Sequence, residues 1–111
     1  MTRADIDYIV LDALANDLES VEDILRLANH PEIGWADLAG GAVAEFSVLL
    51  ALPHLMEDGL VQAYVLDADE GHLEELPVGT QPSVSLDECY FGLTPQGRLV
   101  HASWEPPTDL A

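Results

Sequence analysis

Residues 42–61 carry the strongest structural signal in this chain of 111 residues. A helix is expected from about Ala42 to Glu57, and its apolar residues cover so much of its circumference that it should be deeply packed. Seven residues form this pattern: Val43, Phe46, Leu49, Leu50, Leu52, Leu55 and Met56. Pro53 predicts a kink, because proline removes one intrahelical hydrogen bond and clashes with the preceding turn. Gly59 should end the helix in the left-handed conformation.

Two further helices are expected before this one. Apolar residues at helical spacing predict the first from about Asp5 to Leu18. Ser20 followed by Asp23 resembles a capping box, which opens the second helix, and Pro31 closes it. Three residues of the linker over 33–41 are expected to pack back on the core: Trp35, Leu38 and Ala39.

The segments after Gly59 predict strands and a last helix. Apolar alternation predicts a strand from Val61 to Asp67, and a second strand is expected from Cys89 to Leu93. The long polar segment between them gains partial strand character from three residues: Leu73, Leu76 and Val78. Thr94 as N-cap and Pro95 in the first turn begin a final helix, which Pro106 and Pro107 stop.

Two motifs stand out in the second half of the chain. The first comprises Leu52, Leu55, Glu57, Gly59, Leu60 and Val61. The second comprises Tyr90, Leu93, Thr94, Pro95, Gly97 and Arg98. Together they resemble the winged helix-turn-helix domain of MarR and PadR regulators, over about Ala51 to Trp104. The matched positions are structural ones, such as core leucines, a helix cap and a helix start.

A fold follows from this resemblance and from the length. The length fits one domain spanning residues 1–111. The resemblance implies an α+β fold, mainly α, of the winged-helix kind. It would have three N-terminal helices, a wing of two or three β-strands with a long acidic hairpin, and a short C-terminal helix.

The charge of the chain opposes the usual activity of that family. The chain has three arginines, no lysine and 21 acidic residues, which gives a formal net charge of −18. Duplex DNA binding depends on cationic side chains that displace counterions, and a strongly negative field repels nucleic acid. The expected recognition helix, residues 42–58, has no arginine or lysine. No DNA-contacting residue of the family can therefore be assigned.

The acidic residues are densest in the expected wing. Five of them form a possible surface for a basic partner: Asp67, Asp69, Glu70, Glu74 and Glu75. A solvated hairpin tip is the simpler interpretation of such a run. A calcium loop fits poorly, because Gly71 comes one position early and Val78 stands where a glutamate is needed. Salt adaptation is an alternative explanation of the acidity, since salt screens repulsion among acidic groups.

The sequence predicts no catalytic, metal-binding or cofactor-binding residue. Absence of lysine excludes Schiff-base and P-loop chemistry, and the serines lie in no nucleophile motif. Cys89 is expected to be a small buried residue, and Arg98 a structural partner for a nearby acid. The four histidines lack the i, i+4 spacing of a helical metal site: His30, His54, His72 and His101. The chain is therefore not expected to be an enzyme.

These observations favour a non-enzymatic winged-helix-like module that binds a protein. The partner could be basic, or a second copy that forms a homodimer through the first and last helices. Two alternatives remain open: a DNA-binding regulator with a salt-adapted surface, and an acidic decoy for a basic or DNA-binding protein. No apolar run is long enough for a membrane span. Asp5, Asp7 and Asp12 interrupt any signal-like segment, so the chain is expected to be cytoplasmic.

Overall fold

The computed structural model describes residues 3–30, 43–66, 69 and 71–103. These residues form an α+β fold with four α-helices and a four-stranded antiparallel sheet. The helices are α1 (Arg3–Ala13), α2 (Val21–Ala28), α3 (Glu45–Glu57) and α4 (Pro95–Ser103). The strands are β1 (Glu19–Ser20), β2 (Val61–Leu66), β3 (Leu73–Glu75) and β4 (Cys89–Leu93), and one 3-10 turn, η1 (Leu86–Glu88), precedes β4.

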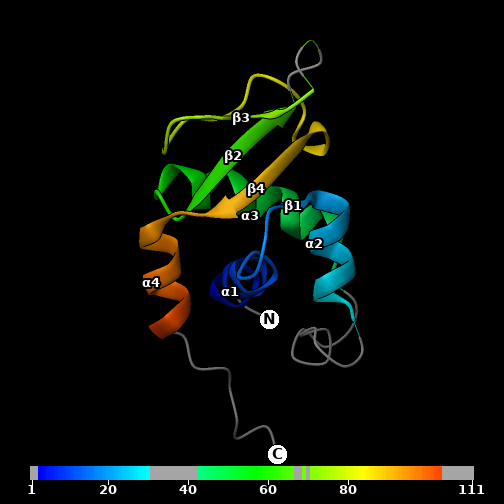
Figure 1. Ribbon diagram of the computed structural model, residues 1–111. Coiled ribbons are helices and arrows are strands. Elements are labelled where there is room, and N and C mark those ends of the chain that lie inside the picture. The colour runs from blue at the N-terminus through cyan, green and yellow to red at the C-terminus, as the bar shows by residue number, and fades with distance from the viewer. Residues whose placement is uncertain (1–2, 31–42, 67–68, 70, 104–111) are drawn as a thin grey trace, which may run out of the picture.

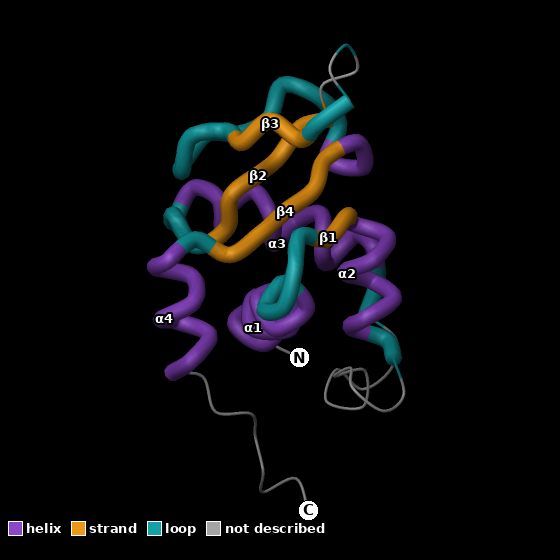
Figure 2. Tube along the Cα trace, in the orientation of Figure 1, coloured by secondary structure: helices purple, strands orange, loops and turns teal. Residues whose placement is uncertain are grey.

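The sheet has the strand order β1-β4-β2-β3, and all its pairs are antiparallel. The pair β2–β4 is the longest, and it runs from Val61 opposite Leu93 to Val65 opposite Cys89. The helices α1, α2 and α4 lie on one side of the sheet, with α1 seen end on between α2 and α4 (Figures 1 and 2). The strand β3 is an edge strand of this sheet.

The apolar face of α1 is buried in the core. Four residues of α1 and one residue just after it are buried: Ile6, Ile9, Val10 and Leu11, and then Leu14. Because Ile9, Val10 and Leu11 are consecutive and all buried, α1 is enclosed over most of its circumference. Among the described helical residues, the exposed large apolar side chains are Phe46 and Leu50 on α3 and Leu99 on α4.

The ends of the second and third helices agree with the sequence pattern. Ser20 caps α2, and its Oγ accepts a hydrogen bond of 3.2 Å from the Asp23 backbone N–H. Gly59 follows α3 with φ +76°. The N–H groups of Gly59 and Leu60 donate to the carbonyls of Met56 and Leu55, which satisfies the last turn of the helix.

The start of α4 is tied to the end of α3. The hydroxyl of Thr94 donates to the Gly59 carbonyl at 2.6 Å and accepts from the Gly97 N–H at 3.0 Å. The Thr94 N–H donates to the Leu60 carbonyl at 3.1 Å. Thr94 is buried, so these bonds are shielded from water. The two motifs of the sequence therefore meet in one junction, whose residues hold α3, β2 and α4 together.

Two helix boundaries differ from the sequence expectation. The first helix ends at Ala13 rather than Leu18, because Glu19 and Ser20 pair with Phe91 and Tyr90 of β4 as strand β1. The third helix begins at Glu45 rather than Ala42. The Asn29 side chain explains this later start, because it accepts from the Val43 N–H and donates to the Val43 carbonyl.

Among the other predictions from the sequence, some are confirmed and some are wrong. The strand Cys89–Leu93 and the start of α4 are confirmed. Val78 lies outside β3 and is exposed. Phe46 and Leu50 are exposed, although a helix packed on most sides was expected. The expected packing of Trp35, Leu38 and Ala39, and the stops at Pro31 and Pro106–Pro107, lie outside the described residues.

Candidate functional site

The acidic surface proposed from the sequence is only partly described. Asp67 and Glu70 lie outside the described residues, and Asp69, Glu74 and Glu75 are exposed. Glu75 is also engaged within the chain, because its carboxylate accepts a hydrogen bond of 2.9 Å from the buried Gln62 amide. Burial, followed by the Glu75 carboxylate, raises the pKa of the Tyr64 hydroxyl, while Arg98 opposes this shift. The three described acids of this surface are therefore accessible to solvent.

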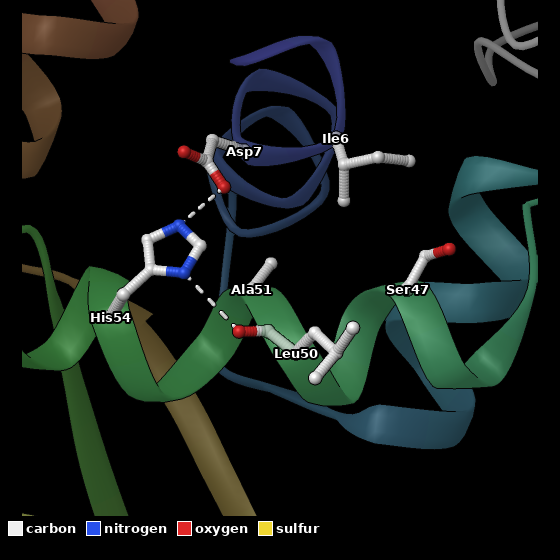
Figure 3. A pocket seen from close by; sticks show the side chains of 6 residues that line it. All are labelled: Ile6, Asp7, Ser47, Leu50, Ala51 and His54. Carbon is white, nitrogen blue, oxygen red and sulfur yellow. Dashed lines mark hydrogen bonds and ion pairs between the residues drawn. The ribbon is translucent and has the colours of Figure 1, made fainter. Parts of the chain in front are cut away.

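A more distinctive surface lies between α1 and α3. Here a pocket of about 450 Å³, which we name the α1–α3 pocket, opens beside the exposed side of α3 (Figure 3). Its lining comprises Ile6, Asp7, Ser47, Leu50, Ala51 and His54. The Leu50 side chain is 58% exposed, and Phe46, one helical turn earlier on the same face, is 69% exposed. Large apolar side chains at such exposure, beside a hollow, are typical of a binding surface.

His54 and Asp7 form one wall of this pocket. The His54 Nε2 lies 2.6 Å from the Asp7 carboxylate, and its Nδ1 lies 3.2 Å from the Leu50 carbonyl (Figure 3). Both partner atoms are acceptors, so both contacts are hydrogen bonds when the imidazole carries a proton on each nitrogen. The ring is thus held across the α1–α3 interface and positions α1 against α3.

The lining of the pocket includes a serine, a histidine and an aspartate, which are the residue types of a serine nucleophile triad. Ser47 lies at the opposite end of the pocket from His54 (Figure 3), and seven residues along a helix correspond to roughly 10 Å. The two His54 nitrogens already contact Asp7 and Leu50. A triad needs a histidine nitrogen within hydrogen-bond reach of the nucleophile, and this arrangement does not provide it.

A second histidine pair links α1 to α4. The His101 Nε2 lies 2.9 Å from the Asp12 carboxylate. Sequence reasoning missed both pairs, because the partners are separated by 47 and 89 residues. Only the placement of α3 and α4 against α1 brings them together. No group of three or more potential metal ligands occurs among the described residues.

A second pocket, of about 490 Å³, lies among α2, α3 and the segment before β4. Its walls carry the carboxylates of Glu22, Glu45 and Asp87 and the ring of Tyr90. This hollow is more polar than the α1–α3 pocket, and one of its carboxylates, Glu45, is the first residue of α3.

The cationic and thiol side chains have structural contacts. Arg26 pairs with Asp23 at 2.6 Å. The Arg98 guanidinium donates to the Ala15 backbone carbonyl at 3.4 Å, so its expected acidic partner is replaced by the loop that follows α1. Cys89 is buried, as expected, and burial, followed by the Glu88 carboxylate, raises the pKa of its thiol. A raised thiol pKa disfavours the thiolate that nucleophilic chemistry needs.

Glu19 provides a test of the electrostatics around β1. Burial, then Asp23 and Asp17, raise its pKa above the ordinary value of 4.5, and Arg26 opposes this shift. A carboxyl whose pKa is higher in the folded state stabilises the fold at low pH, and this contribution is lost as the pH rises. We therefore expect Glu19→Gln to raise the unfolding free energy at pH 7. The gain should vanish in acid, below the ordinary pKa. Urea unfolding at both pH values measures this, and a gain that persists in acid would contradict the assignment.

Comparison of the chain with protein-family models, with curated proteins and with solved structures gives no match. Among the described residues, none of the helices has the length and apolar character that crossing a membrane requires.

Proposed function

We propose that this chain is a non-enzymatic protein-interaction module that binds its partner through the exposed side of α3. The observation that carries the proposal is the exposure of Phe46 and Leu50 beside the α1–α3 pocket. Full burial of a phenylalanine or leucine side chain is worth roughly 1.5–3 kcal/mol. A partner that covers both residues gains the part of this free energy that belongs to their exposed surface, 69% for Phe46 and 58% for Leu50.

A winged-helix-like scaffold is part of the proposal. Three helices precede the strands β2, β3 and β4, and α4 follows them, in the order that the resemblance to MarR and PadR regulators implies. The motif residues Gly59, Thr94 and Gly97 meet at one junction, which supports a structural role for the motif. In this scaffold α3 occupies the place of the recognition helix.

The side chains of α3 favour a protein over DNA as its partner. A recognition helix offers polar and basic groups to base edges and phosphates. The exposed side of α3 instead offers Phe46 and Leu50, and Glu45, Glu57 and Asp58 are exposed at its ends. Desolvated aromatic and aliphatic anchors are typical of protein interfaces.

Two observations support the proposal that the chain is not an enzyme. Both ring nitrogens of His54 contact Asp7 and Leu50, which opposes a role of His54 as general base for Ser47. Burial and a neighbouring carboxylate raise the Cys89 pKa, which opposes thiolate formation at neutral pH.

Affinity capture from native lysate tests the module with two matched variants. Leu50→Glu places a charge at the α1–α3 pocket, and Leu99→Glu places the same charge on α4, where Leu99 is 67% exposed. We expect the wild-type chain and Leu99→Glu to capture the same partner, and Leu50→Glu to capture at least about tenfold less. Equal capture by all three chains would place the binding surface elsewhere and refute the proposal.

A further inference from the structure

The chemistry of the partner can be inferred from the groups around the α1–α3 pocket, an inference that rests on the proposed interaction function. The pocket itself offers an apolar floor, from Ile6, Leu50 and Ala51, and one carboxylate, from Asp7. A smaller hollow of about 120 Å³ shares Asp7 with it and adds Asp58, Leu60 and Val100. Asp7 borders both hollows, and Asp58 follows the last residue of α3, so two carboxylates lie near the C-terminal end of this helix.

A carboxylate also lies at the N-terminal end of α3. Glu45, the first residue of α3, is exposed and precedes Phe46. From Glu45 to Asp58 the chain advances 13 residues, which corresponds to roughly 20 Å along the helix. Of the side chains that the structure describes, the arginines lie on other helices, Arg26 on α2 and Arg98 on α4. Carboxylates therefore lie near both ends of α3, Asp58 at the C-terminal end and Glu45 at the N-terminal end, where it lines the second pocket on the α2 side. Phe46 and Leu50 are exposed between these ends.

We propose that this surface binds a basic amphipathic helix of a partner protein. One apolar side chain of that helix enters the α1–α3 pocket and contacts Leu50, and the next turn covers Phe46. Lysine or arginine side chains at its two ends lie near Asp7 and Asp58 and near Glu45. The spacing of Phe46 and Leu50 by one turn matches the i, i+4 spacing of anchors on a docked helix.

Charge complementarity selects this occupant over a second copy of the chain. A second copy carries the same formal net charge of −18, so two copies repel each other at long range. The acidic ends of the surface would also meet acidic residues across a symmetric interface, and like charges juxtaposed in an interface are costly. A basic helix replaces both penalties with attraction, and it leaves the apolar contacts unchanged.

A labelled peptide provides the test. The probe is a helix of about 14 residues made of leucine and lysine, with the leucines on one face. Its controls are a peptide of the same composition in scrambled order and a peptide with glutamate in place of lysine. Fluorescence anisotropy at about 0.1 M salt measures binding to the wild-type chain, Leu50→Glu and Leu99→Glu, and circular dichroism checks that the variants are folded.

We expect the amphipathic peptide to bind the wild-type chain and Leu99→Glu equally and Leu50→Glu at least about tenfold more weakly. This outcome distinguishes binding in the α1–α3 pocket from non-specific electrostatic attraction. Leu50→Glu adds a negative charge, so electrostatic attraction alone predicts tighter binding of the basic peptide. We also expect the scrambled and acidic peptides to bind at least about tenfold more weakly than the amphipathic one. Equal binding to Leu50→Glu, or equal binding of the scrambled peptide, would overturn the inference.

Two other occupants would give different results. A dimer that light scattering detects, that strengthens with salt and that Leu50→Glu abolishes would assign the surface to a second copy. Nuclear Overhauser contacts between Leu50 and Trp35 without peptide would assign the pocket to the chain itself. Either result overturns the inference. If the peptide fails but a lysate partner still depends on Leu50, only the partner chemistry is wrong; if both fail, the interaction function falls too.

Discussion

Replacing Gly97 with alanine is expected to lower the free energy of unfolding by about 3 kcal/mol, at the upper end of the usual cost of overpacking. A Cβ at this position would overlap the Leu60 carbonyl oxygen and lie 2.9 Å from its carbon. Backbone atoms cannot move aside as a flexible side chain can. The hydrogen bonds that Thr94 makes to Gly59 and Gly97 would be displaced with them.

Chemical unfolding followed by circular dichroism measures this effect. Gln96→Ala is the matched control, because Gln96 is the exposed neighbour of Gly97 in α4 and loses only a solvated side chain. Its unfolding free energy should stay within about 0.5 kcal/mol of the wild-type value. If Gly97→Ala were as stable as Gln96→Ala, the close approach of α4 to Leu60 would be refuted, and with it the structural explanation of the motif.

Salt is expected to stabilise the fold strongly. The chain carries a formal net charge of −18, and most of the acidic side chains that the structure describes are exposed. Their mutual repulsion destabilises the compact state, and sodium chloride screens it as the Debye length falls from about 10 Å at 0.1 M to about 3 Å at 1 M. We expect a gain of about 2 kcal/mol over this range, which corresponds to a rise in Tm of roughly 10 °C.

Thermal unfolding in sodium chloride measures this gain. Sulfate is unsuitable, because it strengthens apolar burial in any protein. A triple variant, Glu57→Gln, Glu74→Gln and Asp87→Asn, removes exposed acids and should respond less to salt than the wild-type chain. A Tm that stays constant with salt, or an equal response of the variant, would show that charge repulsion contributes little to the stability.

The parts of the fold that depend on short-range interactions could be predicted from the sequence. Ser20 and Asp23 lie three residues apart, and a capping hydrogen bond needs no other part of the chain. Gly59 and Thr94 mark helix ends for the same reason. The boundaries of β4 were also predictable, because the short apolar run from Cys89 to Leu93 lies between Glu88 and Pro95.

The parts that depend on distant residues could not be predicted. The first helix ends early because Glu19 and Ser20 pair with β4, about seventy residues further along the chain. Arg98 contacts Ala15 rather than an acid, since packing brings α4 beside the loop after α1. Apolar periodicity also did not indicate which residues of α3 would be exposed. The packing of α1, α2 and β2 against α3 decides that Val48 and Leu52 are buried while Phe46 and Leu50 are not.

The candidate site also combines features that the sequence predicts with features that depend on distant residues. The acidic residues of the hairpin were evident from the sequence, and the described ones, Asp69, Glu74 and Glu75, are exposed. The α1–α3 pocket was not evident, because Ile6 and Asp7 meet Leu50 and His54 only after α1 packs across α3. Sequence reasoning therefore identified the charge that a partner would experience, but it could not locate the apolar anchor that would hold the partner.

Site-specific photo-crosslinking in living cells tests the binding role of α3 most directly. A p-benzoylphenylalanine in place of Phe46 keeps an aromatic side chain at the exposed position beside Leu50. The same group in place of Leu99 on α4 is the control for equal exposure. We predict a discrete crosslinked protein from position 46, which Leu50→Glu abolishes, and no such product from position 99. Crosslinks to nucleic acid at position 46, or the same protein product at both positions, would contradict the account.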